Sequence, residues 1–166
     1  MDEVHARLRR RLEGLTDREF FWQPVSGCWT IYQQESGRWT YHYAEPDPEP
    51  APVTTIGWQL VHLGTCKLMY HEWAYGAAQL TWPELDVPHT AKAAIALLEE
   101  GQELLRHDLQ DLSDADLDDP RRTNWGSIWP AWRIFWTMAD HDALHEGAIG
   151  HLRDVYYWTH HQDTRA

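Results

Sequence analysis

The sequence predicts an all-α fold, a four-helix bundle in which a long crossover between the first two helices carries a small β-hairpin or extended insertion. Two observations lead to this prediction. Apolar residues recur every three or four positions in four separate segments, which is the period of an amphipathic helix. Between the first and second of these segments, the chain is instead rich in aromatic, β-branched and proline residues. With 166 residues and no internal repeat, the chain is expected to form a single domain over residues 1–166.

The first helix is predicted over residues 1–14. Val4, Leu8 and Leu12 lie on one stripe of this segment, and Gly14 closes it. Thr16 begins a capping-box pattern with a glutamate three residues later, which predicts a short helical turn before the crossover.

The crossover is predicted to contain a hairpin. Residues 29–33 and 38–43 are rich in aromatic and β-branched side chains and flank Ser36 and Gly37, as expected for two strands joined by a turn. The alternating prolines that follow exclude a helix and favour an extended connector. The insertion is therefore placed at about residues 32–52.

Three further amphipathic segments predict the remaining helices: residues 56–76, 90–112 and 130–158. They are joined by two segments rich in turn-forming residues: 80–88 and 113–127. Thr54 and Thr55 are the candidate N-caps of the second helix, and Pro130 fits the first turn of the last one. The tail from Thr159 is polar and is expected to fray.

The charge balance excludes some classes of partner. The chain has 14 Lys and Arg against 26 Asp and Glu, a formal net charge of -12. A nucleic-acid binder needs basic side chains to neutralise phosphates, so no nucleic-acid partner is expected. No stretch approaches the roughly 18 apolar residues of a membrane span, and the beginning of the sequence does not resemble a signal peptide. The protein is therefore expected to be cytoplasmic, with no membrane partner.

A His-x-x-x-His pair, His141 and His145, lies on the apolar side of the last predicted helix. Residues four apart on a helix are neighbours on one face, close enough for both imidazoles to bind one metal ion. A zinc-type catalytic site typically has three protein ligands, and His62, on the mainly inward face of the second helix, is the natural third. Three hydrogen-bonded core histidines are the alternative that these residues leave open. Imidazoles suit zinc, nickel, iron or copper, so these residues alone do not choose the metal, and zinc or nickel is the expectation.

Residues beside these histidines on the same helix faces are candidates for the wall of a small-molecule pocket: Trp58, Cys66, Met69 and Met138. Cys66 lies one turn after His62 and could be a fourth ligand, a thiol near the metal or an ordinary buried cysteine. Asp142 and Glu146 each follow a histidine directly, which turns them about 100° away from the ligand face, toward solvent or a neighbouring helix. No phosphate-binding glycine loop or Cys-x-x-Cys pattern is present.

The order of the motifs resembles that of the DinB-like superfamily. The matching pieces are Trp22-Gln23-Pro24 followed by Gly27-Cys28-Trp29-Thr30, the run from Thr55 to Leu63, and the run from His141 to Ile149 continuing into Leu152-Arg153-Asp154. This resemblance implies a four-helix bundle with a three-histidine metal site. The helix-2 histidine of the family corresponds to His62, and its His-x-x-x-His pair to His141 and His145. The insertion departs from the shortest family members and looks like that of an actinobacterial subgroup.

Relatives in this superfamily include transferases and isomerases that use a low-molecular-weight thiol such as mycothiol or bacillithiol. The resemblance therefore implies a thiol-dependent S-transferase for small electrophiles, with His62, His141 and His145 holding a divalent metal. A metal-dependent hydrolase, in which water replaces the thiol, and a non-catalytic small-ligand-binding protein are the alternatives. The expected partner is a small-molecule substrate, and the abundant Trp residues are consistent with a homodimer.

Overall fold

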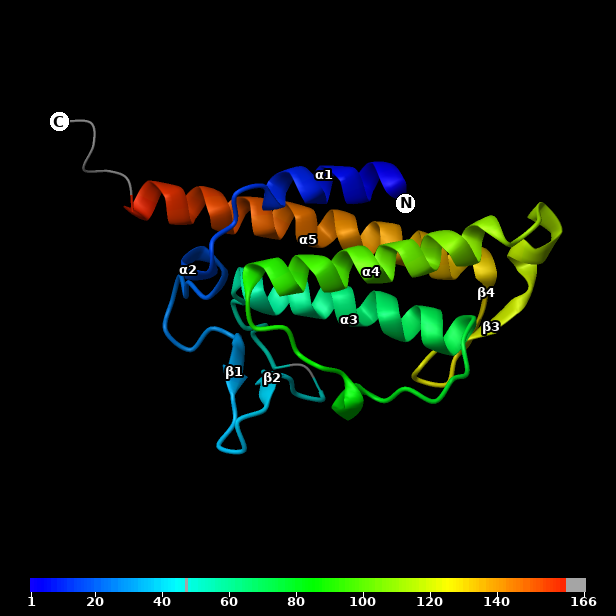
Figure 1. The fold of residues 1–166 in the computed structure, drawn as a ribbon, viewed down its shortest axis with the longest axis horizontal. Helices are drawn as coiled ribbons and strands as arrows, with labels where there is room; N and C mark the ends of the chain where they lie inside the picture. Colours follow the sequence, from blue (N-terminus) through cyan, green and yellow to red (C-terminus); the bar gives the residue numbers. More distant parts are fainter. Residues whose placement is uncertain (47, 161–166) are drawn as a thin grey trace.

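The computed structural model describes residues 1–46 and 48–160. This part of the chain is mostly helical, with four long helices that lie side by side (Figure 1). The helices are α1 (Asp2–Leu12), the short α2 (Asp17–Phe20), α3 (Ile56–Ala74), α4 (Ala91–Gln110) and α5 (Ala131–His160). The strands are β1 (Ile31–Gln33), β2 (Trp39–Tyr41), β3 (Pro120–Arg122) and β4 (Ile128–Pro130). Two 3-10 helices, η1 (Trp82–Glu84) and η2 (Asp114–Asp118), lie in the connections between α3, α4 and α5.

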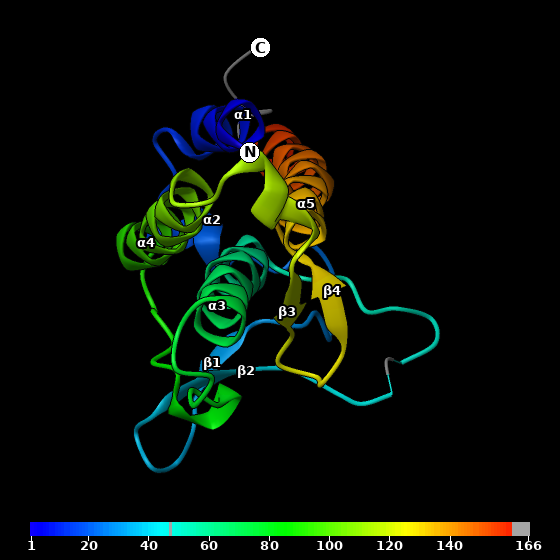
Figure 2. The same cartoon turned by 90° about the vertical axis from the view of Figure 1, so that its right-hand side faces the viewer.

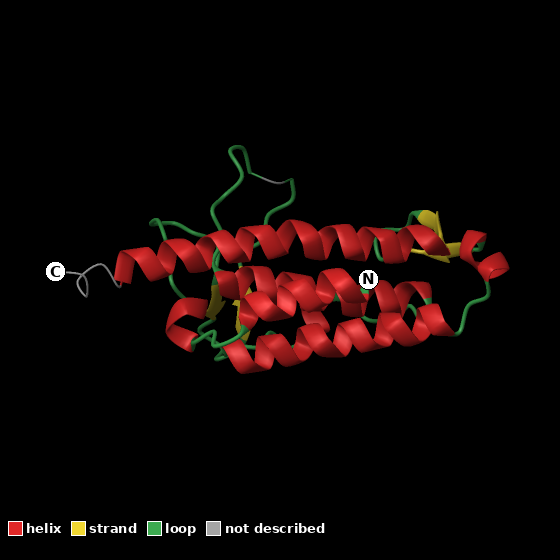
Figure 3. Ribbon diagram, turned by 90° about the horizontal axis from the view of Figure 1, so that it is seen from above, coloured by secondary structure: helices red, strands yellow, loops and turns green. Residues whose placement is uncertain are grey.

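The long helices surround a common core. Seen end-on, they follow one another in the order α1, α5, α3 and α4 (Figure 2), and the view from above shows that their axes run roughly parallel (Figure 3). The side chains of Leu8, Leu60 and Leu98, from α1, α3 and α4, are fully buried in this core. The predicted mostly helical fold is confirmed.

The contact between α3 and α4 is especially close where Gly101 of α4 meets Lys67 of α3. A Cβ atom built on Gly101 would lie only 2.6 Å from the Cβ atom of Lys67. Since no larger side chain fits at this point, glycine allows the two helix backbones to approach. Gly101 therefore has a packing role, although glycine weakens an isolated helix.

The hairpin predicted in the crossover is confirmed. β1 and β2 pair antiparallel with Ile31 opposite Tyr41, and Gly37 in the connecting turn has a φ of 84°. A bridge between Trp29 and Thr54 closes the base of the insertion, of which Asp47 lies outside the described residues. This hairpin and the β3–β4 strand pair both lie beside α3 in the end-on view (Figure 2).

A second hairpin replaces part of the loop predicted at residues 113–127. β3 and β4 pair antiparallel, and the backbone N–H of Thr123 donates to the carbonyl of Ser127 at 2.9 Å. The turn reverses at Gly126, which has a φ of 85°. The strands are too short for an alternating pattern to identify them in the sequence.

Threonine side chains cap the starts of α3 and α4. The Thr55 side chain accepts from the backbone N–H of Trp58 at the start of α3, and Thr90 accepts from Ala93 at the start of α4. α5 continues to His160, two residues beyond the predicted end at residue 158. Residues 161–166 of the predicted polar tail lie outside the described part of the chain. Among the described residues, no helix combines the length and the apolar character that crossing a membrane requires.

Candidate metal centre

Three imidazole rings meet where the middle of α3 faces the middle of α5. Nε2 of His62, on α3, lies 3.0 Å from Nε2 of His141, on α5. Nε2 of His145, one turn further along α5, lies 3.2 Å from the same His141 nitrogen. The structure therefore brings together all three histidines that the sequence singled out as metal ligands.

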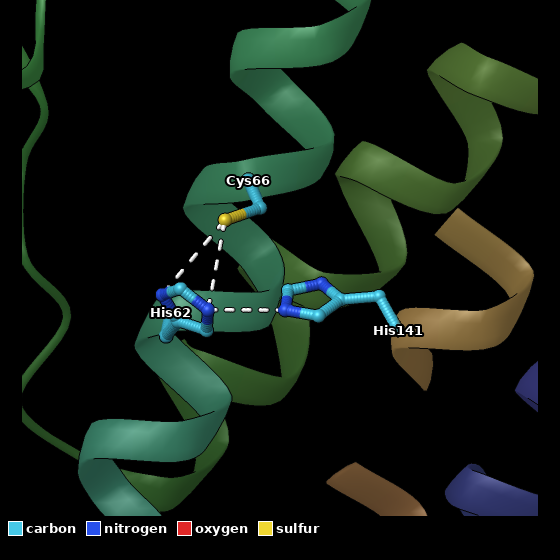
Figure 4. Close-up of side chains that lie close together, drawn as sticks. All are labelled: His62, Cys66 and His141. Carbon is cyan, nitrogen blue, oxygen red and sulfur yellow. Dashed lines mark hydrogen bonds between the residues drawn. The ribbon is translucent and has the colours of Figure 1, made fainter. Parts of the chain in front are cut away.

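Cys66 adds a sulfur atom to this group. Its Sγ lies 3.8 Å from Nδ1 and 3.9 Å from Nε2 of His62, one turn earlier on α3. A group of three donor atoms, one each from His62, Cys66 and His141, lies within 4.8 Å of one another. This cluster could hold a metal ion. Figure 4 shows the Cys66 sulfur and the His141 ring both turned toward His62.

The donor atoms fit a metal ion in spacing and in protonation. With zinc–nitrogen bonds of about 2.0–2.1 Å, two nitrogens of a tetrahedral site lie about 3.3 Å apart, close to the spacing of these imidazoles. Nδ1 of His145 donates to Oε1 of Gln59 at 3.1 Å, because an amide oxygen can only accept. Nε2 of His145 therefore carries the free lone pair that a metal needs. Nδ1 of His141 is buried and has no hydrogen-bond partner among the described residues.

Burial keeps the rings of His141 and His145 neutral. It lowers the pKa of His141 to about 3, with smaller contributions from His145, His62 and the cation of Lys67. Burial, together with His62, lowers the pKa of His145 to about 4. Neutral imidazole is the form that binds metals, so both rings are ready to coordinate at neutral pH. Burial also raises the pKa of the Cys66 thiol to about 12, against a smaller lowering effect of Lys67.

An aromatic neighbour, itself anchored by the insertion, supports the His62 ring. Trp58, one turn earlier on α3, stacks on the imidazole with ring centroids 4.8 Å apart and an interplanar angle of 16°. The indole N–H of Trp58 in turn donates to the backbone carbonyl of His42 at 2.8 Å. Residue 42 follows β2, so the insertion helps to orient a side chain of the candidate metal centre.

A cavity of about 650 Å³ reaches His62 and Cys66 from the side of the two hairpins. Its volume is in the usual range for small-molecule sites. The turn between β3 and β4 reaches beneath α3 in Figure 1 and provides part of the wall. The lining is mainly aromatic and aliphatic: Trp39, Tyr41, Tyr43, Trp82, Trp125, Pro83, Leu85 and Val87. The more polar lining residues are Gln34, Arg38, Thr40 and Asn124.

A family model described as the DinB superfamily matches residues 1–149 of the chain. The chain belongs to the DinB superfamily. The matched residues include His62, His141 and His145, so the candidate metal centre of this DinB protein lies within the part that defines the family. A comparison with curated proteins finds no match.

The four pocket residues predicted for this DinB protein have different positions. Cys66 lines the cavity, whereas Trp58 supports His62 and is not among the described lining residues. Met69 is 1% exposed and Met138 is 2% exposed, and both belong to the core instead of the cavity wall. They share helix faces with the histidines but lie at other levels along the helix axes.

Sequence reasoning missed a buried ion pair next to the candidate metal centre of this DinB protein. Nζ of Lys67, the residue after Cys66, lies 2.8 Å from Oδ2 of Asp142, the residue after His141, and both side chains are 1% exposed. Lys67 also donates to Oε1 of Gln102 at 3.0 Å. The sequence contained one signal of this pair, because Lys67 is the only lysine of the mainly apolar α3 and buried lysines are rare without a partner.

Proposed function

We propose that this DinB protein is a metal-dependent, thiol-using S-transferase for small electrophiles. In this proposal the four long helices form a four-helix bundle, and His62, His141 and His145 hold a divalent ion, zinc or nickel. The observation that supports it best is the group of imidazole nitrogens 3.0 and 3.2 Å apart beside an apolar cavity. A low-molecular-weight thiol such as mycothiol would be the second substrate.

The side chains have separate roles in this proposal. A divalent ion held there would supply a Lewis acid that lowers the pKa of a thiol or of water. Gln59 keeps the proton of His145 on Nδ1, and Trp58 fixes the plane of the His62 ring. The apolar cavity walls exclude water and hold the electrophile. The thiol sulfur forms a bond to the electrophilic carbon, the bond to the leaving group breaks, and the thiol proton passes to solvent.

The preferred ligand set is three histidines, with Cys66 nearby. Nε2 of His141 lies 3.0 Å from Nε2 of His62 and 3.2 Å from Nε2 of His145, whereas burial raises the pKa of the Cys66 thiol and so favours the protonated form, which is a poor metal ligand. A Cys66→Ser variant is therefore expected to keep its metal. A His145→Ala variant is expected to lose it, and the opposite pattern would assign Cys66 in place of His145.

Elemental analysis of protein purified without an affinity tag tests the metal directly. We expect close to one divalent ion per chain, and loss of that ion in His145→Ala. His151→Ala is a matched control, because His151 is an exposed histidine of the same helix. Wild-type protein without metal, or His145→Ala with its metal retained, would refute the ligand assignment.

The reaction is tested by supplying an electrophile with and without a thiol. We expect conjugation only when both thiol and metal-loaded protein are present. Turnover in water alone would indicate a metal-dependent hydrolase instead. Metal and ligand binding without turnover under either condition would indicate a non-catalytic binding protein.

A further inference from the structure

We propose that the cavity beside His62 and Cys66 selects neutral, flat aromatic electrophiles, and that Trp125, Trp39 and Trp82 contact the ring. This substrate class rests on the proposed function, because it concerns the same site. It follows from the shape of the walls, from how they are held and from the charges that face the cavity.

Two of these walls are positioned by aromatic partners outside the cavity lining. Trp125, in the turn between β3 and β4, packs edge to face against Trp129 and Tyr70, with ring centroids 5.2 and 5.3 Å apart. Trp39, on β2, stacks on His89 with centroids 4.8 Å apart and an interplanar angle of 3°. Because the indoles are already held in place, binding a flat ring against them requires little ordering of side chains.

The third wall comes from a different segment. Trp82 begins η1, in the connection between α3 and α4, and 36% of its surface is exposed. Trp125 is 50% exposed. Exposed indoles that line a cavity provide large flat surfaces whose contact with an aromatic ligand removes apolar area from water.

The charges around the cavity favour a neutral ligand. Among the described lining residues, Arg38 alone carries a permanent charge. Its guanidinium donates to the backbone carbonyls of Pro83 and Leu85, so it ties the hairpin to the η1 segment. A carboxylate on the ligand would lose its water and find among the described lining residues a single cationic side chain, whose Nη2 is already engaged by two carbonyls, which makes its burial costly. The net charge of -12 also opposes the approach of anions.

A pair of isosteric electrophiles tests the charge preference, namely chlorodinitrobenzamide and chlorodinitrobenzoate with the same ring substitution. In conjugation the thiol sulfur bonds to the ring carbon that carries chlorine, chloride leaves with the electron pair of the C–Cl bond, and the thiol proton goes to solvent. After division by the uncatalysed rates, we expect kcat/KM for the amide to exceed that for the carboxylate by about 10-fold or more, because the carboxylate is desolvated without compensation. Equal values, or a preference for the carboxylate, would overturn the proposal and indicate that Arg38 binds anions.

Calorimetric titration with the unreactive dinitrobenzamide and dinitrobenzoate measures selection independently of catalysis. We expect Trp125→Ala to weaken binding of dinitrobenzamide by about 10-fold, as for the loss of an aromatic contact and its buried area. Trp136→Ala is the matched control, since Trp136 is 60% exposed on α5 and is not among the described lining residues. Its binding should equal that of the wild type.

Trp82→Ala is a second variant in case Trp125→Ala disturbs its hairpin, and its fold is checked by its melting temperature. Unchanged binding of dinitrobenzamide in both folded variants would overturn the proposed walls. Selective binding of dinitrobenzamide without thiol-dependent conjugation would support the ligand class and count against the S-transferase function. Thiol-dependent conjugation of both probes without discrimination would support the S-transferase function and count against the proposed ligand class.

Discussion

Removing one partner of the Lys67–Asp142 ion pair should strongly destabilise the fold. Both side chains are 1% exposed, and Nζ of Lys67 lies 2.8 Å from Oδ2 of Asp142. In Asp142→Leu, the ammonium group stays in the core with Gln102 as its remaining hydrogen-bond acceptor. Leaving one buried charge without its counter-ion typically costs about 3–5 kcal/mol of unfolding free energy.

The same loss can be expressed as a melting temperature. For a domain of this size, each kcal/mol shifts the melting temperature by roughly 2–4 °C, so Asp142→Leu should melt roughly 6–20 °C below the wild type. The double variant Lys67→Met/Asp142→Leu replaces the pair by apolar side chains. Because no unpaired charge remains, it should recover most of the lost stability, to within about 1–2 kcal/mol of the wild type.

Urea denaturation and thermal melts of metal-free protein provide the assay, since a bound ion would otherwise add its own binding energy to stability. Glu103→Gln is the control, because Glu103 forms an exposed pair with Arg106 and its side chain is 54% exposed. It should change stability by less than about 0.5 kcal/mol. The reasoning is refuted if Asp142→Leu stays within about 1 kcal/mol of the wild type, or if the double variant is no more stable than the single one.

Other perturbations act on the candidate metal centre and on helix packing. Gln59→Leu should lower metal affinity about 10–100-fold, measured by competition with a chelator, because His145 loses the acceptor that keeps its proton on Nδ1. Burial lowers the pKa of His141 to about 3 and of His145 to about 4 from 6.5. At a pH between the folded and unfolded pKa values, the unfolded chain binds more protons than the folded chain. Metal-free protein should therefore lose stability as pH falls from 6.5 toward 4. The profile should be flatter when both histidines are replaced by Gln. Gly101→Ala should cost about 1–3 kcal/mol in urea denaturation by overpacking. Gly147→Ala, where a Cβ has nothing within 4 Å, should gain about 0.5–1 kcal/mol; equal effects of the two glycine variants would contradict the packing role.

The helices and the His141–His145 pair could be predicted from the sequence because their signals are local. The apolar period of each segment and the capping threonines Thr55 and Thr90 determine where the helices begin. His141 and His145 lie on one face of α5 by spacing alone. That His62 meets them depends on α3 packing against α5, which the family resemblance implied and helix periodicity could not.

The pocket residues show where helix periodicity stops being informative. Met69 lies seven residues after His62 and so shares its face, but seven residues advance about 10.5 Å along a helix axis. Met69 is therefore buried at another level of the core. The actual walls come from the hairpins and from η1, whose side chains meet only after segments distant in sequence pack together. Trp39 and Trp125 are such residues, each held by an aromatic partner from another segment or strand.

For Asp142, the sequence predicted the direction of the side chain but not what the side chain contacts. It points away from the ligand face, as its position after His141 requires. That direction leads to Lys67 on α3, and Nδ1 of His5 on α1 lies 3.9 Å from the same carboxylate oxygen. The neighbouring helix, and not solvent, is therefore its environment, and only the packing of α1, α3 and α5 decides between the two.

The ligand cluster and the ion pair are linked by helix geometry. Lys67 and Asp142 each follow a donor residue, Cys66 or His141, so the two helices present their donors on one side and their charges about 100° away. A salt bridge 2.8 Å long therefore constrains how far α3 and α5 can separate at the level of the donors. The imidazole spacing is thus supported by packing in the core and does not depend on a metal to bring the helices together. A site held in this way orders few side chains when it binds an ion, so more of the coordination energy is retained as affinity.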